Sequence, residues 1–95
     1  MIVGLCAFGV SMPGNRSLKD KRRVVRGLKD RLRARHRVAV AEVGAQDVHA
    51  RAELGFAVVG SDRVLVRAVV DDLLRTAAET CEAEIVDEEV EVMEW

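Results

Sequence analysis

The chain has 95 residues, which is enough for one domain with a single hydrophobic core and too short for two. Hydrophobic residues make up 49% of it, so a core can form, whereas aromatic residues make up 3%, too few for a surface that stacks exposed bases. The net charge of −1 hides a strong asymmetry along the chain.

The asymmetry divides a basic segment from an acidic one. Residues 16–37 contain eleven Lys or Arg and two Asp, a local charge of +9, while residues 71–95 contain ten Asp or Glu and one Arg, a local charge of −9. Either the two segments screen each other, within one molecule or across a dimer, or the basic segment binds an anionic partner.

No targeting or membrane-spanning segment is recognisable. Residues 1–10 are apolar, but no basic residue precedes them and no stretch is long enough to cross a bilayer, so we interpret them as a buried strand. The two cysteines lie 75 positions apart and make no disulfide framework. We therefore expect a cytoplasmic protein without membrane contact.

The first predicted elements are a strand, a loop and a helix. Residues 1–12 are continuously apolar and predict a central strand, weakened only by two glycines. A Pro-Gly-Asn run within residues 11–16 predicts a loop. Ser17 is the expected cap of a helix that runs to about His36, because Asp20 follows it at capping-box spacing.

Helical periodicity divides this helix into two faces. The face expected to pack on the core is an apolar arc of Leu18, Val24, Val25, Leu28 and Leu32. The opposite arc, which we call the basic stripe, consists of Lys19, Arg22, Arg23, Arg26, Lys29 and Arg33. Asp30 is the only acid among them, so the stripe has few neighbouring partners for its charges.

The middle of the chain predicts two strands. Residues 37–43 and 51–59 carry the alternation and β-branched content of strands, and the polar residues 44–50 connect them. In the later strand, Phe56 is expected on the helix-covered side and Glu53 on the open side.

A second helix and a last strand follow. Gly60 is expected to break the preceding strand, and Ser61 or Asp62 to cap a helix that runs to about Glu82. Its apolar arc consists of Val66, Val69, Val70, Leu73, Leu74, Ala77 and Cys81. From Ala83 onward the chain is acidic and β-branched, which predicts an edge strand with a charged outer face.

The order of these elements predicts a single α+β domain over residues 1–95. It is a ferredoxin-like βαββαβ sandwich, with two helices on one face of a four-stranded antiparallel sheet and the first and third strands in the centre. The first strand is apolar on both faces, and the helices cover only one. We therefore expect a homodimer that forms through the open sheet face.

No catalytic, metal or cofactor site is predicted. Residues 9–17 have the glycine spacing of a phosphate-binding loop but lack its lysine, although a helix start with Arg16 and Lys19 nearby could hold one phosphate. Cys6, Cys81 and the two histidines lack metal-ligand spacing, so we expect structural roles for them. Nothing combines a nucleophile, a base and an orienting group, so we expect no enzyme.

Two polar clusters have alternative interpretations. Gln46, Asp47 and His49 form a candidate loop site, or they belong to a loop that satisfies its own backbone. The acids of the last strand form a cation site or catalytic pair, or, as we prefer, a solvated edge that resists aggregation. These acids are Glu88, Glu89, Glu91 and Glu94.

The basic stripe is the most specific feature of the sequence. Its charges repel one another unless an anion is present, and a phosphate backbone would supply that anion. The scarcity of aromatic residues favours structured RNA over exposed single strands. An acidic protein surface, including the acidic end of a second copy, fits the same charge.

Several segments resemble the YlxP-like family of small bacterial proteins, and the similarity spans nearly the whole chain. They are SLKDKR at 17–22, VAVAEV at 38–43, the pairs Gln46-Asp47, Arg51-Ala52 and Leu54-Gly55, the Pro13-Gly14 turn and the acidic last strand. The resemblance implies a ferredoxin-like fold and no known activity. Genes of this family often lie near those for translation initiation and ribosome maturation, which implies a bacterial cytoplasmic protein that acts close to ribosomal RNA or on a factor that does.

The resemblance carries over no catalytic residues. The positions that match the family pattern, and are candidates for a shared function, are Ser17, Lys19, Lys21, Arg22, Gln46 and Asp47. His49 departs from it, because many relatives are expected to have a large aromatic residue there.

Three hypotheses follow for the function. The leading one is a non-catalytic, RNA-associated factor in ribosome maturation or translation, which binds structured RNA or a ribosomal subunit through the basic stripe. The second is a homodimeric interaction module whose basic helix binds an acidic protein. The third, by fold analogy alone, is a small-ligand sensor with its site between subunits at the apolar sheet face.

Overall fold

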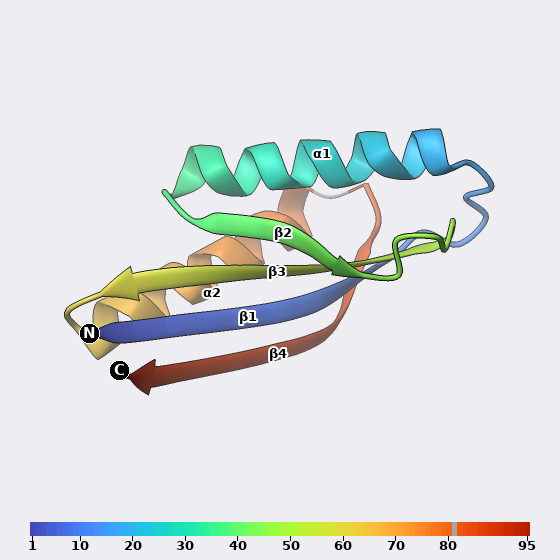
Figure 1. The fold of residues 1–95 in the computed structure, drawn as a ribbon. Coiled ribbons are helices and arrows are strands. Elements are labelled where there is room, and N and C mark those ends of the chain that lie inside the picture. Colours follow the sequence, from blue (N-terminus) through green and yellow to red (C-terminus); the bar gives the residue numbers. More distant parts are fainter. Residues whose placement is uncertain (81) are drawn as a thin grey trace.

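The computed structural model describes residues 1–80 and 82–95. Its elements, in chain order, are β1 (Ile2–Ser11), α1 (Leu18–Arg35), β2 (Ala39–Gly44), β3 (Arg51–Gly60), α2 (Arg63–Thr80) and β4 (Glu84–Glu94) (Figure 1). This is the predicted βαββαβ order of a ferredoxin-like domain, which is thereby confirmed.

The four strands form one antiparallel sheet in the order β2-β3-β1-β4. The first and third strands are therefore central, and the acidic last strand lies at an edge, as predicted. The chain begins and ends at the same end of the sheet (Figure 1), where the backbone N–H of Trp95 donates to the carbonyl of Met1 at 2.7 Å.

Both helices pack on one face of this sheet. Helix α2 crosses β1, β3 and β4, whereas α1 lies mainly against β2 (Figure 1). The side chains that alternate toward the helices make the core, including Phe8, Val10, Leu54 and Phe56 of the two central strands. Phe56 is thus on the covered side and Glu53 on the open side, as predicted.

Polar caps begin both helices. Ser17 Oγ accepts a hydrogen bond from the Asp20 N–H at 3.3 Å, so α1 starts one residue after its predicted cap. Asp62, the second of the two candidates, caps α2 because its Oδ1 accepts from the N–H groups of Val64 and Leu65 at 2.8 and 3.1 Å.

Several predicted boundaries differ from the structure. Strand β2 begins at Ala39, two residues after the predicted start, and continues to Gly44. Gly60 does not break β3 but ends it, paired with Ile2. Helix α2 ends at Thr80, short of the predicted end, and Cys81, which was placed on its apolar arc, lies outside the described residues.

Glycine lets the second helix approach the sheet closely. A Cβ atom at Gly4, on the covered face of β1, would lie 2.8 Å from a methyl group of Val70 and 2.9 Å from one of Val66. At Gly60 it would lie 2.7 Å from Val66 Cγ2. Gly4 therefore belongs to the packing of α2 on β1, although in the sequence it resembled a weak point of the strand.

No helix within residues 1–80 and 82–95 is long and apolar enough to cross a membrane.

Candidate functional site

The basic stripe lies on the side of α1 that faces away from the core. Arg22, Arg23 and Arg26 are exposed there, and Lys29 is half-buried. A hollow of about 560 Å³ runs along this surface, and its lining includes Asp20 and Asp30 as well as the bases of the first two turns. The stripe is therefore a real surface, with two acids at its borders.

Two of its six residues are engaged within the protein. Arg23 makes a bidentate pair with Glu82, with N–O distances of 3.1 and 3.3 Å, and this contact lowers the pKa of Glu82. Arg33 donates from Nη2 to the carbonyl of Val40 at 2.8 Å. The expectation that the stripe is largely unpaired holds only for its other four members. Within the described part of the chain Lys19, Arg22, Arg26 and Lys29 make no ion pair.

Within residues 1–80 and 82–95, the acidic segment forms ion pairs with α1 at two points. Besides Arg23 with Glu82, Arg35 pairs with Asp72 of α2 at 2.8 Å. Strand β4 lies at the edge opposite β2, away from α1, and no ion pair among residues 1–80 and 82–95 joins it to α1. Among the described residues, the two segments therefore screen each other in part, through Asp72 of α2 and through Glu82, and not through the acidic strand.

Asp72 ties the end of α1 to α2. Its carboxylate accepts from Arg35 Nε and lies within 2.8 Å of His36 Nε2, and Arg75 also contacts it. These hydrogen bonds, first that of Arg35 and then that of His36, hold the pKa of Asp72 well below its usual range. His36 thus has a structural role at the end of α1.

Lys21 is not among the residues predicted to lie in the core, yet it is the one charged residue among the buried side chains of the described residues, with 2% exposure. Its Nζ donates to the carbonyls of Ala45, Gln46 and Val48 and lies 3.2 Å from Glu42 Oε2. The ammonium group therefore fastens the β2–β3 connection to α1. One signal was visible in the sequence, since Lys21 falls on the apolar arc, four residues before Val25.

In the candidate loop site, no hydrogen bond within residues 1–80 and 82–95 joins the side chains of Gln46, Asp47 and His49. Gln46, Asp47 and His49 are all exposed. The carbonyl of Gln46 is engaged by Lys21, and that of His49 accepts from Asn15 Nδ2. The loop's backbone is therefore satisfied from α1 and from the first loop. This supports the interpretation of these residues as structural, with partners other than those the sequence suggested.

The start of α1 is a poor place for a phosphate. The hollow beside it, about 560 Å³, is lined by Asp20, Glu82 and Glu84 together with Arg23, whose charge Glu82 already balances. Neither Arg16 nor Lys19 lines it. Across residues 1–80 and 82–95, no group of three or more His, Cys, Asp or Glu side chains is arranged to hold a metal ion.

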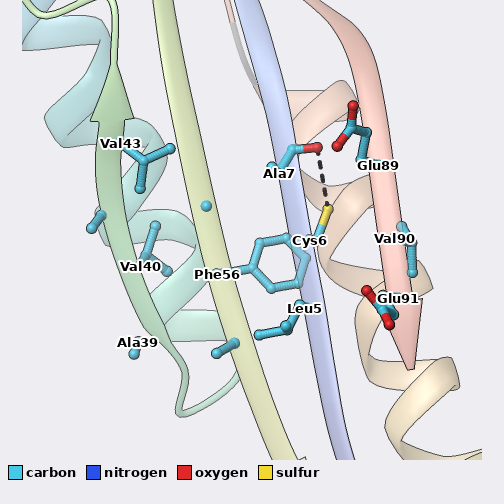
Figure 2. Close-up of a pocket in the computed structure, with 13 residues that line it drawn as sticks. Leu5, Cys6, Ala7, Ala39, Val40, Val43, Phe56, Glu89, Val90 and Glu91 are labelled. Atoms are coloured by element: carbon cyan, nitrogen blue, oxygen red, sulfur yellow. Dashed lines mark hydrogen bonds between the residues drawn. The ribbon is translucent and has the colours of Figure 1, made fainter. Parts of the chain in front are cut away.

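The open face of the sheet carries a further hollow, of about 520 Å³ (Figure 2). Its lining comes from all four strands, and Figure 2 shows the acids Glu89 and Glu91 of β4 along one side. The apolar lining residues that alternate onto this open face are Leu5, Ala7, Ala39, Ala41, Val43, Gly55 and Ala57, and the lining also includes Cys6, Val40, Phe56 and Val90. As predicted, Gly55 and Ala57 lie on this open side.

An ionic cluster bounds this apolar area at one end. The side chain of Arg51 crosses β1 above Gly9 to reach Asp87 of β4 at 2.9 Å, and it also lies 3.5 Å from Glu53. A Cβ atom at Gly9 would lie 2.5 Å from Arg51 Nη2, so glycine makes room for this crossing. The open face is thus polar near the end of β1 and apolar near its start.

Cys6 lies behind this hollow and is chemically quiet. Burial, reinforced by the negative charge of Glu88, raises the pKa of its thiol to about 12. The thiol is therefore protonated at neutral pH and is a poor nucleophile.

The architecture and these surfaces define a small ferredoxin-like α+β protein with one basic helix and one uncovered apolar sheet face. The chain belongs to the family described as a protein of unknown function (DUF503), whose model matches residues 3–90. A de novo designed protein, Ferredog-Diesel, is similar at 11% sequence identity and a TM-score of 0.46, over 97% of this chain and 84% of that one. No curated protein matches the chain.

Proposed function

We propose that this protein is a non-catalytic, RNA-associated factor that binds structured RNA through the basic stripe of α1. The observation that carries the proposal is the group of four cations, Lys19, Arg22, Arg26 and Lys29, which have no ion-pair partner within the described residues. They share one side of one helix, so they can contact several phosphates at once.

Structured RNA fits this surface for two reasons. The cations supply sequence-independent contacts with phosphates, whereas the chain has only two Phe, one Trp and no Tyr for stacking on exposed bases. The resemblance to YlxP-like proteins, which is compatible with the family found here, supports a role in ribosome maturation or translation in the bacterial cytoplasm.

The proposal is tested by measuring binding to a short RNA duplex by fluorescence anisotropy across a range of salt concentrations. The variant Arg22→Glu/Arg26→Glu should weaken binding strongly and reduce the slope of log K against log salt by about 2. The control Arg63→Glu/Arg67→Glu changes the net charge by the same amount, but on α2 instead of α1. It should retain most of the affinity for RNA. Equal losses in the two variants, or no binding by the wild type at low salt, would refute the proposal.

An acidic protein is the second candidate partner. The observation that favours it is that two arginines of α1, Arg23 and Arg35, already bind carboxylates of this chain through paired N–O contacts. The two candidate partners are separated by repeating the anisotropy measurement with an acidic polypeptide in place of the RNA duplex. A stripe that binds an acidic polypeptide such as polyglutamate, and not the RNA duplex at equal salt, would identify this second function.

A further inference from the structure

The open face of the sheet exposes apolar side chains of β1, β2 and β3 that nothing in the described chain covers. Leu5 is 39% exposed, Val43 60% and Val59 65%, although all three belong to strands. Both helices pack on the other face, so the hollow of Figure 2 faces solvent. Contiguous apolar surface of this kind marks an interaction site in soluble proteins.

We propose that this face binds a second copy of the chain, with the two-fold axis parallel to the strands and midway between β1 and β3. The two sheets would pack face to face at roughly 10 Å, as in a β-sandwich. The arrangement is independent of the RNA proposal, because the basic stripe is on α1, on the other side of the sheet.

The sizes of the side chains match this axis. Leu5 and Ala57 are paired across β1 and β3, and so are Ala7 and Gly55. A two-fold axis between these strands places each β1 residue over the β3 residue with which it is paired in its own chain. Leu5 then meets Ala57 of the second copy and Ala7 meets Gly55, so that a large side chain faces a small one.

The charges also select this axis. Across the sheet, Ala39, Ala57, Leu5 and Glu91 share one level, and Ala41, Gly55, Ala7 and Glu89 the next. With the axis parallel to the strands, the acids of β4 lie over the alanines of β2 in the second copy, near the exposed Arg37 that precedes them.

The alternative two-fold axis, perpendicular to the strands, is unfavourable. It would place β4 over β4, so that Glu89 and Glu91 of both copies would meet. Like charges brought together at an interface oppose binding. A face with acids along only one edge strand therefore complements a second copy in one of these two orientations and not in the other.

The first measurement is the mass in solution by sedimentation equilibrium over a range of concentrations. The wild type should form a dimer, and Leu5→Glu should weaken it about 100-fold or more, because the symmetry introduces two charges into the apolar centre. Val64→Glu is the matched control, since Val64 is 76% exposed on α2 and lies outside the face. A monomeric wild type, or an unchanged dimer in Leu5→Glu, would overturn the proposal.

A second pair of variants tests the axis at an exposed alanine, where misfolding is not a concern. Ala39→Lys should tighten the dimer about 3- to 10-fold, because each new lysine approaches Glu91 of the second copy, and Ala39→Glu should weaken it. The perpendicular axis would bring residue 39 of both copies together, so both substitutions would then weaken the dimer. That result would overturn the proposed arrangement.

Discussion

At the scale of single residues, the buried ammonium group of Lys21 should contribute strongly to stability. It donates to three carbonyl oxygens of the β2–β3 connection and forms an ion pair with Glu42 Oε2, an atom that has no hydrogen-bond partner among residues 1–80 and 82–95. Lys21→Met keeps the volume but leaves these acceptors without a donor, so it should lower the free energy of unfolding by about 3 kcal/mol.

Urea unfolding of Lys21→Met measures this effect, and Lys19→Met is the control, because Lys19 is exposed on the same helix. A loss similar to that of the control would show that the ammonium group contributes no more than a surface lysine. The position of Lys21 on the apolar arc could be predicted from the sequence. Its acceptors could not, because they come from a connection more than twenty residues away, placed only when β2 and β3 pair.

Two glycines should respond to substitution with opposite signs. Gly27 lies inside α1, and a Cβ atom there would have nothing within 4 Å, so Gly27→Ala should stabilise the fold by about 0.5–1 kcal/mol. Gly4→Ala should destabilise it by about 1–3 kcal/mol, because the added methyl group meets Val66 and Val70.

Thermal unfolding of the two glycine variants tests this contrast. Ala34→Gly, at an exposed site in the same helix as Gly27, is the control and should lose about what Gly27→Ala gains. A stabilised Gly4→Ala would mean that α2 can move away from the sheet at no cost.

At the scale of elements, local signals set where the helices begin, while contacts between elements decide where they are held. Ser17 and Asp62 mark helix starts because each cap acts within three residues of itself. The contact between α1 and α2, made by Asp72 with Arg35 and His36, has no comparable local signal in the sequence. Asp72 reads as an ordinary surface acid in the sequence and contacts Arg35 and His36 only after both helices pack on the sheet.

This contact between α1 and α2 should be sensitive to acid. The pKa of Asp72 is lower in the folded protein than in the unfolded chain, so its contribution to stability is fully present above the unfolded value of about 4 and is lost as the pH falls below it. Asp72→Asn should therefore be less stable than the wild type at pH 7, and its melting temperature should fall less between pH 6 and pH 3.

Asp71→Asn is the comparison for this pH experiment, because Asp71 is the sequence neighbour of Asp72 but makes an exposed i, i+4 pair with Arg67. Its melting temperature should follow the wild-type pH dependence closely. Parallel pH profiles for the wild type and Asp72→Asn would show that the Asp72 cluster does not couple folding to protonation.

At the scale of the whole molecule, the order of elements and the two sheet faces followed from periodicity, because alternation along β3 separates Phe56 from Glu53 whatever the partners are. The distribution of charge did not follow in the same way. The sequence showed a basic and an acidic segment. Which Lys and Arg side chains form ion pairs depends on which carboxylates the fold brings close to them. Glu82 can reach Arg23, whereas the acids of β4 lie at the opposite edge of the sheet from β2.

The four cations of the stripe that make no ion pair within residues 1–80 and 82–95 should bind small anions, as the proposed contact with RNA phosphates requires. Sodium phosphate should raise the melting temperature more than sodium chloride at equal ionic strength, because an anion that binds the folded stripe stabilises it by mass action. Phosphate also strengthens apolar burial in general, so the informative quantity is the difference between variants. The gap between the two salts should shrink in Arg22→Glu/Arg26→Glu and persist in Arg63→Glu/Arg67→Glu. The same gap in all three proteins would mean that phosphate acts on the fold at large, and that the stripe is a solvated face without preference for phosphate.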